Sequence, residues 1–256
     1  MTTRLPGAVR EAAEFALATN TSRSMDRRSS QPPRPTGGSI VPIRLGRVLR
    51  ALDHSLHRIL WRIELVAIVL IIALLNLPLL AGTFSTEFIF HPGAVEAGEW
   101  WRVFTHPFVH VSRYHLTLDA AAFFLAYVEL RQRPFRRRLL LILAAGGGSL
   151  LAALLFSTAV QTLGLCGLSG IAHGLTAVVS LDILRRETDR LVRWGAIACF
   201  IIVVGKCLVE AITGHVVFES WHLGSLGTPI AVCHAGGVLG ALAAWLYFDL
   251  RSEPEF

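Results

Sequence analysis

Long uncharged apolar runs constrain this chain more than any other feature of its sequence. No Asp, Glu, Lys or Arg occurs between Glu64 and Glu87, within positions 139–181, or within positions 223–248. A helix rises about 1.5 Å per residue, so about 20 apolar residues cross the hydrocarbon core of a bilayer. The first and third runs suit one crossing each, and the second suits two. The sequence therefore predicts an integral membrane protein built from helices.

Hydropathy and charge together predict six membrane-spanning helices. We expect them at about residues 63–82, 115–130, 139–159, 168–185, 191–211 and 229–249. The second span opens with His115 and Asp119, and a span with such polar residues packs against other helices rather than against lipid. The predicted fold class is all-α: a polytopic membrane protein whose six-helix bundle occupies residues 56–250.

The two ends of the chain lie outside this predicted bundle. Residues 1–55 are rich in Arg, Ser, Thr and Pro, and such a stretch buries too little apolar surface to order itself. We predict a disordered cytoplasmic N-terminal tail there and a short cytoplasmic C-terminal tail at residues 251–256. Met25 is the only methionine after Met1, so either residue is a candidate start.

Arginine is concentrated in three of the segments that flank the predicted spans. They precede the first span, join the second to the third, and join the fourth to the fifth. They hold Arg44, Arg47, Arg50 and Arg58; Arg131, Arg133, Arg136, Arg137 and Arg138; and Arg185, Arg186, Arg190 and Arg193. With six spans and both termini cytoplasmic, all three lie on the cytoplasmic side, as the positive-inside rule expects. The net charge of +6 is then explained by topology and contact with anionic lipid, not by nucleic acid binding.

Four polar residues meet at one depth in this topology. Ser169 lies in the first turns of the fourth span, His234 near the outer end of the sixth, and His115 and Asp119 near the outer end of the second. A serine hydroxyl needs a base to take its proton, and histidine does this near neutral pH. Nearby glycines let a substrate backbone approach, and a helix N-terminus offers backbone N–H groups to an oxyanion. We therefore expect Ser169 and His234 to form a nucleophile–base pair.

These motifs resemble those of the rhomboid family of intramembrane serine proteases. The resemblance rests on Gly167-Leu168-Ser169-Gly170 at the start of the fourth span and on His234, followed by Gly237, in the sixth. It extends to Glu99-Trp100-Trp101-Arg102, to His106, His110 and His115, and to Asp119, and it covers roughly residues 60–250.

The resemblance implies hydrolysis of a peptide bond in or beside the transmembrane segment of another membrane-anchored protein. Ser169 would attack the carbonyl, and His234 would act as base and then as acid toward the leaving amine. No third residue is expected to orient the histidine. His115 and the backbone N–H of Ser169 would hold the oxyanion. No metal or cofactor is expected.

Further motif residues are expected to support this pair. Gly167, Asp119 and His173 would lie around it, and the first outer loop would be braced by Trp101, Arg102, His106 and His110. The resemblance implies a multi-pass protein of the bacterial inner membrane. The sequence names neither its substrate nor its oligomeric state.

Two positions depart from the usual rhomboid pattern. Rhomboids usually carry Asn where this chain has Asp119, and an ionised carboxylate cannot donate a hydrogen bond to an oxyanion. Asp119 is then either protonated, or it orients His115 instead. His173 stands where many rhomboids have a tyrosine that packs on the catalytic histidine. In this respect the run from Ser169 to Gly174 is more like the rhombosortase branch, whose members process proteins with a C-terminal Gly-Gly sorting tail.

Other bases for Ser169 stay open at this point. His173 lies on the same helical face as Ser169 and is a second candidate. Lys206, the only lysine, is a third, although Glu210 one turn later is a salt-bridge partner for it. No histidine is followed by Glu, so the HExxH motif of a metalloprotease is absent.

Two further hypotheses concern activity and the cysteines. The chain could be an inactive rhomboid-like scaffold that binds membrane proteins without cutting them, and the substitution at Asp119 keeps that alternative open. Cys166 and Cys233 flank the candidate pair on the oxidising outer side, where they could form a disulfide. The alternative is two unpaired residues.

Overall fold

The computed structural model describes residues 40–217 and 223–251. The chain divides into two compact units, residues 1–56 and 57–256. In the first unit the described part is the beginning of helix α2 (Ile40–Leu75). The predicted N-terminal tail therefore lies outside the described residues up to position 39, and residues 40–55 are helical where the sequence predicted disorder. Apolar residues recur there at positions 45, 48, 49 and 52, which is helical spacing.

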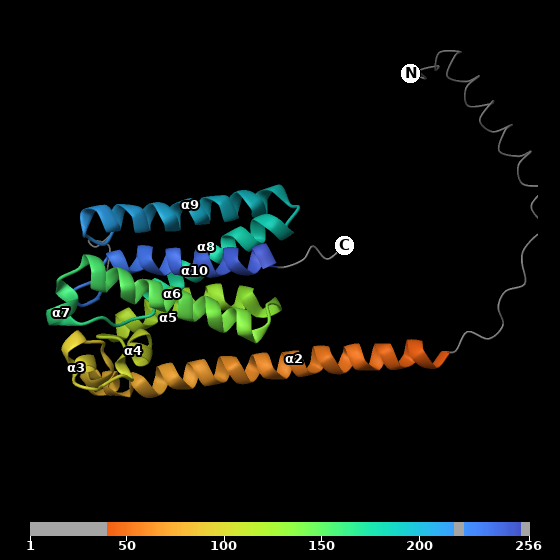
Figure 1. Cartoon of the computed structure of the whole chain (residues 1–256), viewed down its shortest axis with the longest axis horizontal. Coiled ribbons are helices and arrows are strands. Elements are labelled where there is room, and N and C mark those ends of the chain that lie inside the picture. The colour runs from red at the N-terminus through yellow and green to blue at the C-terminus, as the bar shows by residue number, and fades with distance from the viewer. Residues whose placement is uncertain (1–39, 218–222, 252–256) are drawn as a thin grey trace, which may run out of the picture. The chain divides into compact units, whose positions relative to one another are not determined.

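The second unit is a bundle of long helices joined by short helical turns (Figure 1). After α2 the long helices are α5 (Arg113–Glu129), α6 (Phe135–Phe156), α8 (Ser169–Arg186), α9 (Arg190–Thr213) and α10 (Val232–Arg251). The short ones are α3 (Pro92–Glu96), α4 (Arg102–Thr105), α7 (Ala159–Leu163) and the 3₁₀ turns η1 (Leu77–Ala81), η2 (Thr86–Phe88), η3 (His106–Phe108) and η4 (Leu130–Gln132). Within the described ranges there is no strand, only an isolated bridge between Phe90 and Leu165. The predicted all-α class is confirmed.

Three of the described helices are long and apolar enough to cross a membrane by length and composition, namely α6, α9 and α10. The other three long helices each overlap one predicted span, but the count of six stays a prediction. The reason for the modest hydropathy of α8 is its position: it contacts α5, α6, α9 and α10. A helix enclosed by other helices can carry polar residues that a lipid-facing helix cannot.

The core of the bundle lies between α5, α6, α8 and α10. Phe123, Tyr127, Leu141, Leu175 and Trp245 are buried together in it. Large apolar side chains on α6 and α9 are instead exposed on the outside of the bundle, which is the surface expected to face lipid.

Glycines bring α10 into backbone contact with two neighbouring helices. A Cβ placed on Gly237 would collide with the carbonyl of Gly170 in α8, and one on Gly236 would collide with the carbonyl of Gly148 in α6. Small residues of this kind let helix backbones approach closely, and such packing drives helix association in membranes. The contact sets the spacing between the helices that carry Ser169 and His234.

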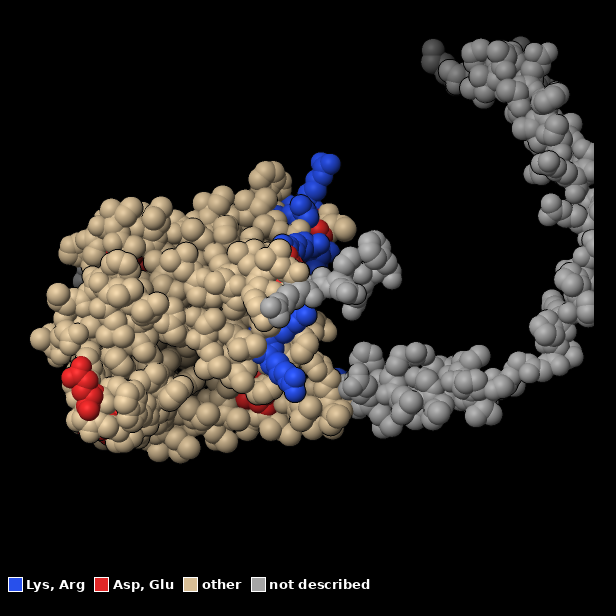
Figure 2. All heavy atoms as spheres, viewed as in Figure 1, with Lys and Arg blue, Asp and Glu red and all other residues tan. Residues whose placement is uncertain are grey.

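Basic side chains gather at one end of the bundle. Figure 2 shows them at the end opposite α3 and α4, where η4 meets α6 and where α8 meets α9. Two largely buried ion pairs link segments at this end, Arg138 with Glu64 and Arg133 with Asp182. Ser169 begins α8 and Arg186 ends it, so Ser169 lies at the far end of that helix from the arginines.

Replacing Gly237 with alanine should destabilise the bundle, because the added methyl group meets the backbone of Gly170. Overpacking of this kind costs about 1–3 kcal/mol. The matched control is Gly147→Ala in α6, where an added Cβ meets nothing within 4 Å. Alanine should be neutral or slightly stabilising there, because it favours helix over glycine. Thermal unfolding of both variants in detergent, followed by circular dichroism, checks this; equal midpoints would contradict it.

Candidate functional site

Backbone hydrogen bonds hold the start of α8 against the loop between α2 and α5, residues 76–112, called here the outer loop. Leu165 exchanges two backbone hydrogen bonds with Phe90, at 2.9 and 3.0 Å. Gly167, at φ +103°, donates its N–H to the carbonyl of His106 at 3.1 Å. That φ favours glycine over other residues. The turn places Ser169 at the first position of α8.

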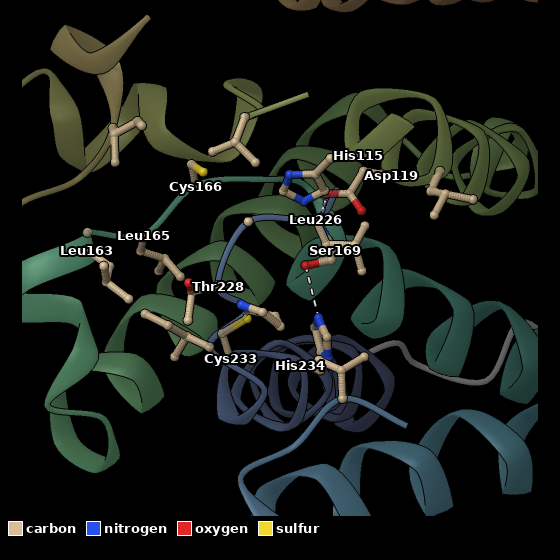
Figure 3. A pocket seen from close by; sticks show the side chains of 18 of the residues that line it. His115, Asp119, Leu163, Leu165, Cys166, Ser169, Leu226, Thr228, Cys233 and His234 are labelled. Carbon is tan, nitrogen blue, oxygen red and sulfur yellow. Dashed lines mark hydrogen bonds and ion pairs between the residues drawn. The ribbon is translucent and has the colours of Figure 1, made fainter. Parts of the chain in front are cut away.

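Ser169 and His234 lie within hydrogen-bond distance of each other. The Nε2 atom of His234 on α10 is 3.0 Å from the Oγ atom of Ser169 on α8 (Figure 3). His234 is 7% exposed, and its ring stacks on that of His173 at 4.3 Å between centroids. The residues are 65 positions apart in the chain, so only the packing of α8 on α10 brings them together.

His173 uses both ring nitrogens for other partners. Its Nδ1 lies 2.7 Å from the backbone carbonyl of Ser169, one turn earlier on α8. A carbonyl can only accept, so Nδ1 carries the proton and Nε2 is the acceptor. That Nε2 lies 3.1 Å from the Nζ atom of Lys206. The arrangement favours packing beside His234 over the alternative that His173 is itself the base.

A buried carboxylate contacts the far side of His234, which sequence reasoning missed. The Oε2 atom of Glu210 on α9 lies 2.6 Å from Nδ1 of His234. Its Oε1 atom lies 2.6 Å from Nζ of Lys206, the salt bridge that their spacing predicted. An ionisable side chain within an apolar span is a functional-site signal in itself. That signal could have drawn attention to Glu210.

Asp119 accepts the backbone N–H that was expected to hold an oxyanion. Its Oδ2 atom lies 3.0 Å from the backbone nitrogen of Ser169 and 3.2 Å from Nε2 of His115. Nε2 of His110 lies 3.4 Å from the same oxygen. His115 Nδ1 is buried and has no hydrogen-bond partner among the described residues. Of the two roles left open for Asp119, these contacts favour orienting His115.

A cavity of about 420 Å³ opens beside these residues. Its polar part holds Ser169, His234, His115, Asp119, His173 and Lys206. Most of the remaining wall is apolar and comes from the outer loop, from the segment before α8 and from residues 226–230 before α10. An apolar cleft with a few convergent polar groups is the usual form of a binding site. The described residues contain no cluster of three His, Cys, Asp or Glu side chains suited to a metal ion.

Comparison with known protein families matches residues 97–252 to the Rhomboid domain. The chain belongs to the rhomboid family. This family consists in general of serine intramembrane proteases and also includes inactive members. Together with the apolar helices, the match identifies an integral membrane protein. A search of curated proteins finds no match to the chain.

The outer loop of this rhomboid domain is braced by side chains bonded to backbone carbonyls. Arg102 reaches the carbonyls of Thr86 and Ile89, each at 2.7 Å, and its Nε lies 2.6 Å from Glu99. Trp101 donates its ring N–H to the carbonyl of Glu87 at 3.1 Å. The loop positions predicted from sequence therefore do contact the loop backbone.

His106 and His110, the two histidines predicted to brace the outer loop, are both buried. His106 donates from Nδ1 to the carbonyls of Arg102 and Val103, at 3.1 and 3.0 Å. His110 bonds through its backbone N–H to Oδ1 of Asn76 at 2.9 Å. Asn76, which the sequence did not single out, also donates to the carbonyls of Ile72 and Phe108.

Of the two alternatives for the cysteines, the structure has the unpaired one. Cys166 and Cys233 are both free, although both line the cavity. Figure 3 places their sulfur atoms on different sides of it, because Cys166 lies in the segment before α8 whereas Cys233 packs with Ala153 and Val160. Burial raises the pKa of the Cys166 thiol to about 12. That thiol therefore stays protonated and weakly reactive at neutral pH.

The outer loop should lose stability in acid. Burial lowers the pKa of His106 from 6.5 to about 4, so the folded loop holds this imidazole neutral. A depressed pKa gives stability that is complete above pH 6.5 and is lost as pH falls toward 4. The shift corresponds to a loss of about 3 kcal/mol at most.

The measurement is the unfolding midpoint in detergent between pH 7.5 and 4 for wild type and His106→Asn. We expect the variant to be less stable at pH 7.5 and to lose less stability in acid. His215→Asn, at an exposed histidine, is the control and should follow wild type. Parallel pH curves for wild type and His106→Asn would contradict the assignment.

Proposed function

We propose that this rhomboid-family chain is an active serine endopeptidase. It would cleave peptide bonds in or next to the transmembrane segments of other membrane proteins. The observation that carries the proposal is the 3.0 Å contact between Oγ of Ser169 and Nε2 of His234 at the edge of an apolar cavity. A hydroxyl becomes nucleophilic when a base at this distance takes its proton. No metal or cofactor takes part in the proposed reaction.

The proposed reaction has two halves. In the first, Ser169 Oγ bonds to the substrate carbonyl carbon while His234 Nε2 takes the hydroxyl proton. The carbonyl electron pair moves to oxygen, and its return breaks the C–N bond as Nε2 protonates the amine. In the second half, water attacks the acyl-enzyme with His234 again as base, and the acid is released from Ser169.

The oxyanion needs donors in this site. The backbone N–H of Ser169 is one, and a forming oxyanion would have to displace the carboxylate of Asp119 from it. Nε2 of His115, which donates toward Oδ2 of Asp119 at 3.2 Å, is the candidate second donor, and the oxyanion would likewise have to displace the carboxylate from it. Gly167 lets the backbone pass close to His115 and Asp119, because a Cβ there would lie 2.9 Å from both Nε2 of His115 and Oδ2 of Asp119. Preorganised donors of this kind act strongly in a buried site.

The proposed substrate is a membrane-anchored protein whose helix unwinds locally at the cleavage site. The largely apolar cavity suits such a segment. We place the site on the outer side of a bacterial inner membrane, with six spans and cytoplasmic termini, because it lies away from the arginine-rich end. His173, stacked on His234, supports assignment to the rhombosortase branch, and thus cleavage of C-terminal sorting tails.

One observation favours an inactive binding scaffold as the second candidate. The carboxylate of Asp119 occupies the Ser169 N–H and would repel a developing negative charge there. Labelling of Ser169 by a fluorophosphonate probe distinguishes the two functions.

A fluorophosphonate probe should label the detergent-solubilised protein at Ser169. The serine Oγ would displace fluoride from phosphorus and pass its proton to His234. Ser169→Ala should abolish labelling, whereas Ser180→Ala, on the same helix with its hydroxyl bonded to Thr176, should label at the wild-type rate. Gel fluorescence measures the rate. Folded wild-type protein that does not label, or labelling retained in Ser169→Ala, would support the scaffold.

Replacing Asp119 with asparagine should raise the labelling rate several-fold. The amide oxygen can still accept from His115 while the amide nitrogen becomes a donor to the oxyanion. Asp119→Ala can neither accept a hydrogen bond from His115 nor donate one to the oxyanion, so it should lower the labelling rate. Both variants are measured with the same probe. A lower rate in Asp119→Asn than in wild type would show that the negative charge itself is required.

A further inference from the structure

Glu210 forms a third link behind the Ser169–His234 pair, and the outline of a two-residue mechanism leaves it without a role. We propose that Glu210 is a positioning residue for the reaction. It would fix the ring orientation and the protonated nitrogen of His234, forming a Ser169–His234–Glu210 chain across helices α8, α10 and α9. The inference rests on the proposed protease function and deepens it.

The bonding partners of His234 assign its proton. A carboxylate can only accept, so the 2.6 Å contact between Oε2 of Glu210 and Nδ1 of His234 places the proton on Nδ1. In the neutral ring, Nε2 then carries the lone pair, and it faces Oγ of Ser169 at 3.0 Å. This tautomer is the one in which His234 can accept the serine proton. With Nε2 protonated instead, the ring could not act as base.

Glu210 is itself held rigidly. It is 0% exposed, and its second oxygen, Oε1, accepts from Nζ of Lys206 at 2.6 Å and from the backbone N–H of Val217 at 3.0 Å. Both carboxylate oxygens are therefore occupied by donors. A buried network in which each polar group is satisfied is rigid and specifies one geometry.

The charges around His234 favour transfer of the Ser169 proton to its ring. Lys206 offsets the charge of Glu210 while His234 is neutral. When His234 takes the proton from Ser169, the positive ring stays hydrogen-bonded to the Glu210 carboxylate. Such a pair attracts more strongly in a buried site than in water. Lys206 also donates to Nε2 of His173, whose ring stacks on His234 and limits its rotation.

The alternative is that Glu210 has only a structural role, as the counter-ion of Lys206. The geometry separates the two roles, because Lys206 contacts Oε1 whereas His234 contacts Oε2. Variants can separate them as well, since removing both charges abolishes the need for a counter-ion but not the need to orient His234.

The test is the kinetics of fluorophosphonate labelling of the full chain in detergent, resolved into probe affinity and maximal rate. Glu210→Gln should lower the maximal rate by about 10²–10⁴-fold with little change in affinity, since an amide can donate to Nδ1 and so favour the wrong tautomer. Glu210→Asp keeps a carboxylate and should recover part of that rate. A purely structural role would not lower the maximal rate while leaving the affinity unchanged, and Glu210→Asp would not restore part of that rate.

Two further variants complete the test. Glu64→Gln removes a part-buried carboxylate from the ion pair with Arg138, which does not line the cavity, and should label like wild type. The double variant Glu210→Gln/Lys206→Met leaves no unpaired buried charge, so it should fold even where Glu210→Gln does not. We expect it to label as slowly as Glu210→Gln. A counter-ion role alone predicts wild-type labelling in the double variant.

The outcomes separate this inference from the proposed function. If wild type labels at Ser169, and either folded Glu210→Gln or the double variant labels within about threefold of wild type, the inference is overturned and the protease assignment stands. If wild type itself does not label while folded, the protease assignment fails and the inference fails with it.

Discussion

The close packing of α10 against α8 and α6 is the contact on which the site depends. Gly237 meets the backbone of Gly170, one residue after Ser169, and Gly236 meets the backbone of Gly148. Larger side chains would push the helices apart and separate Oγ of Ser169 from Nε2 of His234. Because the hydrophobic effect does not drive helices together within lipid, such close contacts carry much of the association energy. The same packing therefore both stabilises the bundle and brings these two atoms within hydrogen-bond distance.

The polar residues of the interior form two networks around Ser169. On one side, the Asp119 carboxylate accepts from the backbone N–H of Ser169 and contacts the ring of His115. On the other side, the Glu210 carboxylate contacts His234 through one oxygen and Lys206 through the other. A buried charge without a partner is costly in a low-dielectric interior, so each carboxylate both requires and organises the donors around it. The site is consequently a rigid arrangement in which both buried carboxylates have donors.

Much of the helical framework could be predicted from the sequence. Each long helix overlaps a range that the apolar runs and arginine clusters had indicated, because length and hydropathy decide which segments a bilayer accommodates. The start of α2 was predicted less accurately. The arginine-rich composition of residues 40–55 indicated disorder, although their apolar residues have helical spacing. The sequence also left open whether Cys166 and Cys233 pair, and both are free in the structure; their positions along the helices do not set the directions of the side chains.

The sequence by itself determined which residues could do chemistry and where along their helices they lie. Ser169 begins a helix, His234 lies near the start of another, and Lys206 and Glu210 share one helical face. Only the tertiary structure decided which of these groups meet. Glu210 turns one oxygen to His234 rather than both to Lys206, and His173 bonds a backbone carbonyl rather than the serine hydroxyl. The reason is physical: helical periodicity relates residues within one helix, whereas the faces that different helices present to each other follow from packing the whole bundle.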